Sequence, residues 1–217
     1  DYVLLNSAQD HKRIFEGDKG PNTGGMGAYS PTHLSTSEIV SKTKLEIIEP
    51  ILKAMRDENH PFVGFLYVGL MVVKNNPYVI EFNVRMGDPE TQVVLPLLES
   101  SLYELLWNAS KGEIKKSHVK LSNKTAVSVV LASEGYPNSY KKGMEIFGID
   151  DKKLIFHAGT KVEGSKVFSN GGRVLNVVGF GENLQAAIDD AYSIVENISY
   201  ENIYYRKDIG QKGICKD

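Results

Sequence analysis

The segment VIEFNVRMGDPET at residues 79–91 decides how this chain is expected to fold and what chemistry it can carry. Side chains alternate along a β-strand, so Glu81, Asn83 and Arg85 are expected to share one face. The residues between them are apolar, and their face is expected to pack against the protein: Ile80, Phe82 and Val84. The pattern therefore predicts a strand with one polar face and one packed face.

The polar face of this strand offers the ligands of a hard cation. Glu81 brings a carboxylate and Asn83 an amide oxygen, and oxygen ligands of this kind suit Mg²⁺. Mg²⁺ in turn suits a nucleoside triphosphate, and Arg85 could hold a phosphoryl group or a developing acyl phosphate. An edge strand with a polar outer face would show the same spacing, so spacing alone leaves both interpretations open.

Two neighbouring features are also candidates for binding. Asp88 precedes Pro89 and is expected to cap the following helix, although its carboxylate could equally hold a substrate ammonium group. The loop Gly20–Gly27 reads GPNTGGMG, and its backbone N–H groups could approach an anion. It lacks the Gly-Lys-Ser/Thr ending of a P-loop, and a flexible connector is the alternative.

The order of elements predicts an α+β protein in two parts. Apolar runs at Gly64–Val73 and Tyr78–Asn83 predict a β-hairpin, and a capping-box pattern at Ser35 predicts a helix that Pro50 should kink or split. A lysine-rich connector at 111–125 places the boundary, giving domains 1–118 and 119–217. The other predicted elements are strand Tyr2–Asn6, helices Asp88–Glu99 and Leu102–Ser110, strands Ala126–Ser133, Leu154–Ala158, Lys166–Ser169 and Arg173–Phe180, and helix Leu184–Ile198.

Composition narrows the class of protein. The formal net charge is −2, which argues against a general nucleic-acid grip and against a polybasic membrane anchor. No apolar run is long enough to span a bilayer, and the first residues do not form a signal peptide. The single cysteine, Cys215, cannot build an internal disulfide framework, so a cytoplasmic setting is expected.

Seven motifs together resemble the phosphoribosylamine–glycine ligase family of the ATP-grasp superfamily. They span nearly the whole chain in the order of that family, and their combination is far more specific than any one of them. The motifs are DHKR at 10–13, GPNTGGMGAYSP at 20–31, GFLYVGLMV at 64–72, VIEFNVRMGDPETQ at 79–92, HAGT at 157–160, NGGRVL at 170–175 and YRKDIG at 205–210.

The resemblance implies a reaction and a set of roles. ATP, glycine and 5-phosphoribosylamine would give glycinamide ribonucleotide, ADP and phosphate through glycyl phosphate. Glu81 and Asn83 resemble ligands of Mg²⁺ or Mn²⁺, Arg85 the arginine that stabilises phosphoryl transfer, and Asp88 a carboxylate that orients the amino substrate. The remaining implied substrate contacts are the glycine-rich loop, with Gly24 and Gly25, and two cations that resemble holders of a ribose 5-phosphate, Lys161 and Arg173.

By the same resemblance, the chain is the C-terminal portion of an ATP-grasp domain, an antiparallel sheet with helices, followed by a small mixed α/β domain. The family also has an N-terminal domain and an ATP-binding subdomain, so this chain is expected to be inactive, or nearly so, without that half. Position Gly69 stands where many ATP-grasp enzymes carry a second acid. Another ATP-grasp carboxylate–amine ligase and a non-catalytic module are the alternatives.

Overall fold

The structure is a computed structural model that describes residues 1–214, so Cys215 lies outside the described residues. The contacts divide the chain into two compact units, each assembled from separate stretches. Unit 1 comprises 1–7, 32–87 and 98–121, and unit 2 comprises 8–31, 88–97 and 122–217. Among the described residues, no helix is both long and apolar enough to cross a membrane.

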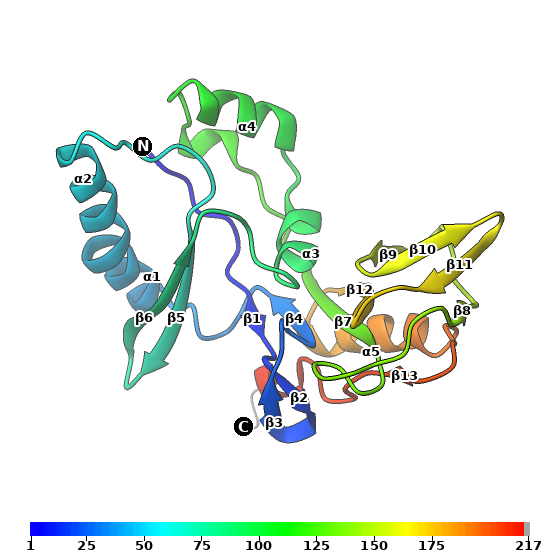
Figure 1. Ribbon diagram of the computed structural model, residues 1–217. Coiled ribbons are helices and arrows are strands. Elements are labelled where there is room, and N and C mark those ends of the chain that lie inside the picture. Colours follow the sequence, from blue (N-terminus) through cyan, green and yellow to red (C-terminus); the bar gives the residue numbers. More distant parts are fainter. Residues whose placement is uncertain (215–217) are drawn as a thin grey trace. The chain divides into compact units, whose positions relative to one another are not determined.

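The main sheet of unit 2 is antiparallel, with the order β1-β4-β7-β12-β9 and β13 also paired to β7 (Figure 1). Gly27 in β4 pairs with Val129 in β7, so the early and late parts of the chain share one sheet. Stretches of the two units therefore alternate along the sequence, whereas the predicted division places one boundary at 118/119. The strands are β1 (Gln9–Asp10), β4 (Gly27–Ser30), β7 (Thr125–Ser133), β9 (Leu154–His157), β12 (Arg173–Gly181) and β13 (Ile203–Tyr204).

Helix α5 (Leu184–Val195) packs against β7 and β12 and closes the core of unit 2. Its N-cap is Asn183, whose side-chain oxygen accepts a hydrogen bond from the Ala186 N–H at 3.0 Å. Gly179 permits the close approach of helix and strand, because a Cβ there would lie 2.2 Å from the Ala191 nitrogen. The helix was predicted to reach Ile198 and ends three residues earlier.

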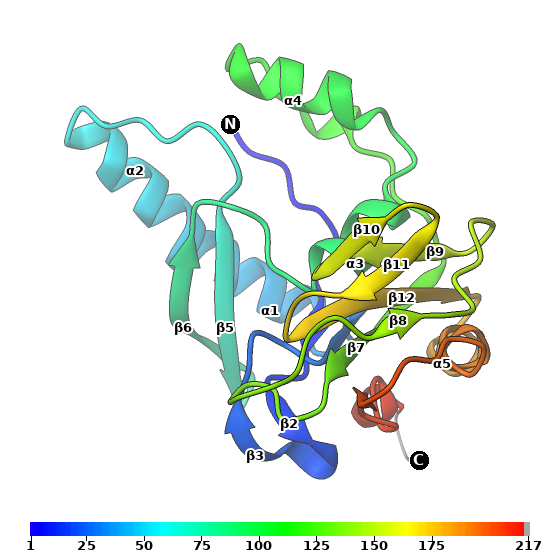
Figure 2. The same cartoon turned by 45° about the vertical axis from the view of Figure 1, so that its right-hand side comes forward.

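Smaller elements complete unit 2 (Figure 2). A hairpin near the beginning of the chain and a separate three-stranded sheet, of order β10-β11-β8, were only partly predicted. The hairpin strands are β2 (Arg13–Phe15) and β3 (Lys19–Asn22), and the sheet strands are β8 (Glu145–Ile146), β10 (Thr160–Glu163) and β11 (Lys166–Ser169). The short helical elements are α3 (Thr91–Val94) and the 3₁₀ turns Glu16–Asp18, Leu95–Leu97 and Gln211–Gly213.

Unit 1 contains the predicted long helix in three pieces: α1 (Ser37–Lys42), a π-helical segment (Thr43–Ile48) and α2 (Glu49–Asp57). The N-cap is Thr36, not Ser35, and its hydroxyl accepts from the Ile39 N–H at 3.3 Å. Pro50 is the second residue of α2. The φ and ψ angles at both junctions of the π-helical segment are helical, so the helix changes from π to α geometry just before Pro50 and is not split there.

The predicted hairpin of unit 1 is confirmed as β5 (Tyr67–Val73) and β6 (Asn76–Asn83). The turn residues Lys74 and Asn75 have φ of +48° and +58°, the left-handed pair that a two-residue hairpin turn requires. The expectation that alternate residues of β6 are packed was wrong. A bulge shifts the register between Gly69 and Leu70, and the expected packed residues are 63%, 41% and 75% exposed: Ile80, Phe82 and Val84.

The remaining segments of unit 1 precede or follow this hairpin in the sequence. Helix α4 (Leu102–Ser110) begins after Ser101, whose hydroxyl accepts from the Glu104 N–H, and a 3₁₀ turn covers Lys116–His118. The predicted strand Tyr2–Asn6 is absent, because this segment pairs with no strand among the described residues.

Candidate active site

Arg173 lies in unit 2 and is hydrogen-bonded to two other predicted site residues, Gly24 and Asp88. Its Nη1 donates to the Gly24 carbonyl at 3.0 Å and to the Asp88 carbonyl at 2.8 Å. Its Nη2 forms an ion pair with Asp88 Oδ2 at 3.1 Å. The guanidinium therefore ties the glycine-rich loop to the start of the DPET segment, 149 and 85 residues away in the sequence.

The two glycines of the loop are needed for this close packing. A Cβ on Gly24 would lie 2.9 Å from Arg173 Cζ, and one on Gly25 would lie 2.4 Å from Pro89 Cδ. Gly25 also has φ of +118°, which a residue with a side chain adopts only under strain. The Gly24 N–H is satisfied by the Tyr136 hydroxyl at 2.9 Å, a contact that sequence reasoning missed.

Asp88 does not cap the following helix, contrary to the first of its two predicted roles. Helix α3 begins at Thr91 with Glu90 as its N-cap residue. The Asp88 side chain instead accepts from Gln92 Nε2 through Oδ1 at 3.0 Å and pairs with Arg173 through Oδ2. Its carboxylate is still about half exposed, so it can also face a solute.

Lys161 is not part of this group. Its ammonium forms an exposed ion pair with Glu163 Oε1 at 2.5 Å, within β10. Sequence position alone could not show this, because alternate residues of an exposed strand can pair with each other.

Glu81 and Asn83 lie in unit 1, on the same side of β6. Their partners in the register are Gly69 and Tyr67, which are also two residues apart, so both side chains leave the sheet on one face. A Cβ on Gly69 would lie 3.0 Å from Glu81 Cγ, so the glycine leaves room for that carboxylate. Arg85 follows the last strand residue, and its Nη1 donates to the Met86 carbonyl at 3.1 Å. Strand alternation therefore does not place Arg85 on that face.

These two oxygen donors fit a divalent cation that takes its other ligands from elsewhere. Neither side chain has a hydrogen bond or ion pair within residues 1–214. No cluster of three or more His, Cys, Asp or Glu side chains suited to a metal occurs in that range. A cation at Glu81 and Asn83 would thus keep sites for phosphate oxygens and water.

Two buried titratable groups adjoin the glycine-rich loop, and sequence reasoning assigned neither a role. Asp10 is paired with Lys12 at 2.7 Å, but burial and the charge of Glu90 raise its pKa to about 6. His11 is fully buried, and burial, Lys212 and Arg206 lower its pKa to about 3. Its Nε2 accepts from the Gly210 N–H at 3.2 Å, so the ring is neutral. The only signal was their place in the DHKR motif.

Arg206 holds the β2–β3 hairpin, and strand β3 of this hairpin includes the first three residues of the predicted glycine-rich loop, 20–22. Its side chain is 1% exposed and is bidentate to Asp208, with both distances 2.7 Å. It also donates to Asp18 Oδ1 at 3.0 Å and to the Arg13 carbonyl at 2.9 Å. The YRKDIG motif thus fixes the position of the hairpin from the far end of the chain.

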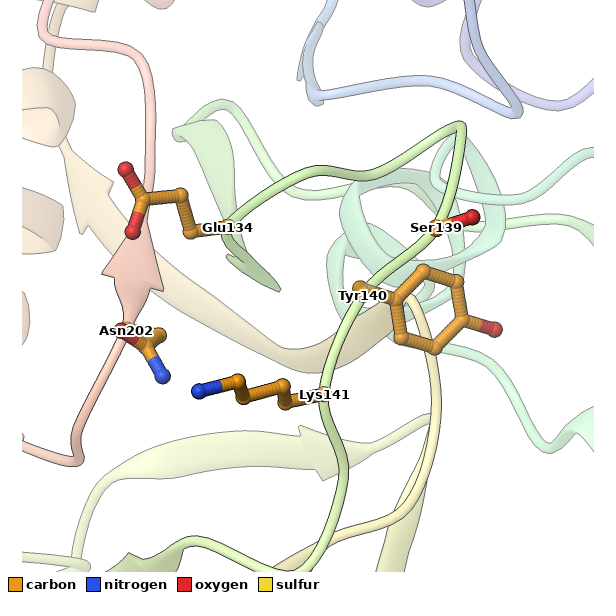
Figure 3. A pocket seen from close by; sticks show the side chains of 5 residues that line it. All are labelled: Glu134, Ser139, Tyr140, Lys141 and Asn202. Carbon is orange, nitrogen blue, oxygen red and sulfur yellow. The ribbon is translucent and has the colours of Figure 1, made fainter.

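A separate open pocket of about 420 Å³ lies on unit 2, near the loop that carries Tyr136. Figure 3 shows Lys141 pointing toward Asn202, with the Glu134 carboxylate on the same side. None of the predicted site residues lines it.

Comparison with known proteins identifies the family. Residues 1–91 match the family model "Phosphoribosylglycinamide synthetase, ATP-grasp (A) domain", and residues 126–212 match "Phosphoribosylglycinamide synthetase, C domain". The phosphoribosylamine–glycine ligase of Rhizobium meliloti is 45% identical over 98% of this chain and 51% of its own length. The trifunctional purine biosynthetic protein adenosine-3 of Homo sapiens is 46% identical over 96% of this chain and 21% of its own length.

Comparison with solved structures supports the same family. A phosphoribosylamine–glycine ligase from Thermotoga maritima has a TM-score of 0.89 and 39% identity, covering 96% of this chain and 52% of that one. A biotin carboxylase domain from Hydrogenobacter thermophilus, at 13% identity, has a TM-score of 0.59 over 88% of this chain and 42% of its own, and shares the fold alone. The chain thus spans about half the length of the ligases it matches. With both family models in order along a mixed α/β chain of antiparallel sheets, this chain belongs to the phosphoribosylglycinamide synthetase family of the ATP-grasp superfamily.

Proposed function

We propose that this chain is the C-terminal half of a phosphoribosylamine–glycine ligase and that it needs the N-terminal half for activity. The assembled enzyme would ligate glycine to 5-phosphoribosylamine at the expense of ATP, in the cytoplasm. The observation that carries the proposal is the convergence of three family motifs on Arg173, which contacts both the glycine-rich loop and Asp88. The division into family domains at 118/119 is part of the same proposal.

The chemistry has two steps. The glycine carboxylate attacks the γ-phosphorus of ATP, which forms glycyl phosphate and releases ADP. The amine of 5-phosphoribosylamine then attacks the acyl carbon, and phosphate leaves with the bonding electrons. Most of the catalysis must come from positioning and charge neutralisation, because phosphoryl transfer needs little covalent help from the protein.

Each proposed residue has a role that suits its chemistry. Glu81 and Asn83 would hold Mg²⁺ or Mn²⁺, which when bound neutralises the phosphates of ATP. Arg85 is exposed and makes one backbone hydrogen bond, so its guanidinium can turn to a phosphoryl group. Asp88 would hold an ammonium group of the amino substrate through its exposed carboxylate.

The glycine-rich loop and the two cations would serve the second substrate. Gly24 and Gly25 keep the loop backbone close to Arg173 and Pro89. Arg173 uses Nη1 and one N–H of Nη2 within the protein, so its contact with a ribose 5-phosphate would come from Nε or the second N–H of Nη2. Lys161 would have to leave Glu163, an exposed pair of small energy.

The test is ADP release by this chain joined at Asp1 to the N-terminal half of the Leptospira interrogans ligase, a 46% identical relative. Glycine and 5-phosphoribosylamine are omitted in turn, and the matched variants are Arg85→Ala and the exposed Arg56→Ala. ADP that requires both substrates and is lost only in Arg85→Ala supports the proposal. ADP that ignores glycine points to another ATP-grasp carboxylate–amine ligase. Nucleotide binding without any ADP release points to a non-catalytic module.

A further inference from the structure

The backbone N–H groups of the glycine-rich loop already have partners within the protein. All four N–H groups from Thr23 to Met26 donate hydrogen bonds, at 2.8–2.9 Å. The acceptors are, in order, the Lys12 carbonyl, the Tyr136 hydroxyl, the Thr23 hydroxyl and the His11 carbonyl. Residues 23–26 therefore have no spare backbone donor for an anion, so an anion beside them must be bound by side chains.

Lys12 is a cation whose backbone is fixed to this loop. Its carbonyl accepts hydrogen bonds from both the N–H and the hydroxyl of Thr23, at 2.8 and 2.9 Å. Its side chain is 49% exposed, so a solute can reach it. The lysine ammonium is a compact point charge with three donors, and it commonly binds phosphate in proteins. Lys12 therefore has the position and the chemistry of a side chain that binds an anion at the loop.

A buried carboxylate holds the ammonium group of Lys12. Asp10 Oδ2 lies 2.7 Å from Lys12 Nζ, and the Asp10 side chain is only 9% exposed. The other oxygen, Oδ1, packs directly against the loop, because a Cβ on Gly25 would lie 2.8 Å from it. Within residues 1–214 this oxygen accepts no hydrogen bond. The Asp10 carboxylate thus orients Lys12 and is itself out of reach of a solute.

The charge on Asp10 destabilises the fold, so it calls for an explanation. Burial, together with the charge of Glu90, raises the pKa of Asp10 to about 6, and the carboxylate is still largely ionised at pH 7. An ionised oxygen that is buried without a hydrogen bond costs free energy. Charged groups in such surroundings are concentrated at functional sites. The position of the Lys12 ammonium is the feature that this buried charge controls.

The cations assigned so far to the ribose 5-phosphate leave its charge incompletely neutralised. A phosphate monoester carries about −1.5 to −2 charges at pH 7. Arg173 shares its charge with Asp88 at 3.1 Å, and Lys161 shares its charge with Glu163 on β10. Arg173 also donates to a carbonyl of the glycine-rich loop, so it and Lys12 contact the same loop. Lys12 would thus add a second cation at the loop to that of Arg173.

We propose that Lys12 binds a phosphate group of a substrate beside the glycine-rich loop, and that Asp10 is the positioning residue that holds its ammonium. This inference rests on the proposed function, in which phosphate occurs on the ribose of 5-phosphoribosylamine and in the phosphoryl group that passes from ATP to glycine. The ribose 5-phosphate is the expected occupant, because Arg173 contacts the same loop. The proton stays on Lys12 throughout, and the ammonium acts by its charge and its hydrogen bonds.

The experiment measures the steady-state rate of ADP release by this chain joined at Asp1 to the N-terminal half of the Leptospira interrogans ligase. Lys12→Gln should raise the KM for 5-phosphoribosylamine roughly 10- to 100-fold and leave the KM for ATP unchanged, because it removes a charge-assisted hydrogen bond. Lys12→Arg should restore part of the loss. The matched control is Lys166→Gln, which removes an exposed lysine from its ion pair with Glu145 and should change no KM value.

Two further variants separate binding from folding. Lys12→Gln leaves Asp10 without its cation, so the double variant Asp10→Asn with Lys12→Gln is made as well, and it should show the same KM effect without the buried charge. Asp10→Asn alone should raise the KM for 5-phosphoribosylamine roughly 3- to 10-fold, while its Tm at pH 7 equals or exceeds that of the parent. Weaker substrate binding in a protein that is no less stable excludes misfolding as the cause.

Unchanged KM values in Lys12→Gln and in the double variant overturn the proposal. A rise in the KM for ATP alone keeps the phosphate site and assigns it to the transferred phosphoryl group. Binding of ribose 5-phosphate, measured by calorimetry, tests the site without turnover. Binding that the double variant loses supports the site even where the joined protein releases no ADP, a result that would refute the ligase. ADP release that requires both substrates, with unaltered KM values in the variants, supports the ligase and refutes the site.

Discussion

At the scale of single residues, the neighbours Asp10 and His11 respond to pH in opposite directions. The folded protein raises the pKa of Asp10 from 3.8 to about 6 and lowers that of His11 from 6.5 to about 3. The fold therefore binds the Asp10 proton more tightly than the unfolded chain does, and the His11 proton less tightly. As the pH rises, the stability that the protein gains at His11 is partly offset by the stability that it loses at Asp10.

We expect His11 to contribute to unfolding in acid. Its stabilising contribution is complete above pH 6.5 and is lost as the pH falls toward 3, by about 3 kcal/mol between pH 7 and pH 4.5. The variant His11→Gln should flatten this part of the pH dependence, measured by urea unfolding at half-unit pH steps. The exposed His60→Gln is the control. An unchanged profile in His11→Gln would show that another group causes the acid sensitivity.

For Asp10 the sign is reversed. Its contribution to stability falls as the pH rises from 3.8 to about 6, so Asp10→Asn should stabilise the protein at pH 7 by up to about 3 kcal/mol. The gain should vanish near pH 4, where the native carboxyl is protonated. Urea unfolding at pH 4 and pH 7 measures both values. A variant less stable at both pH values would show that the Lys12 ion pair outweighs the burial of the charge.

At the scale of elements, Arg206 determines how the β2–β3 hairpin is attached. We expect Arg206→Gln to destabilise the protein by about 1–3 kcal/mol, because it removes the charge-assisted hydrogen bonds of a buried guanidinium to two partly exposed carboxylates, Asp208 and Asp18. Chemical unfolding at pH 7 measures the loss. The exposed pair of Lys166 and Glu145 is the comparison, and Lys166→Gln should cost under about 1 kcal/mol. Similar losses for both variants would contradict the account.

Sequence patterns predicted elements well where contacts are local. The helix starting near residue 36, the hairpin at Tyr67–Asn83 and helix α5 follow from caps, turn residues and apolar spacing. The predictions failed where a residue far away in the sequence determines the local structure. Asp88 is not a cap because Arg173 takes its carboxylate, and Ile80 is exposed because a bulge shifts the register. Tyr136 carried no signal, since its contact is with a loop 112 residues away.

At the scale of the whole molecule, the interleaved connectivity makes a prediction about truncation. A protein consisting of residues 119–217 would lose β1 and β4, and the edge of β7 that pairs with Gly27 would be open. We expect it to aggregate, because buried residues such as Val127 and Val129 would meet water. A protein starting at Ala8 keeps all six strands and should stay monodisperse in sedimentation. A monodisperse 119–217 fragment would show that β1 and β4 are dispensable.

The chain passes five times between the two units, and this has a consequence for how such a protein can be inherited. If a gene were broken between residues 8 and 121, each unit would be divided between two products. At least one product would then lack segments that its sheet or helices pack against. Fusion and fission events should therefore transmit the whole stretch as one genetic module. The match of nearly the entire chain both to single ligases and to a trifunctional protein fits such block inheritance.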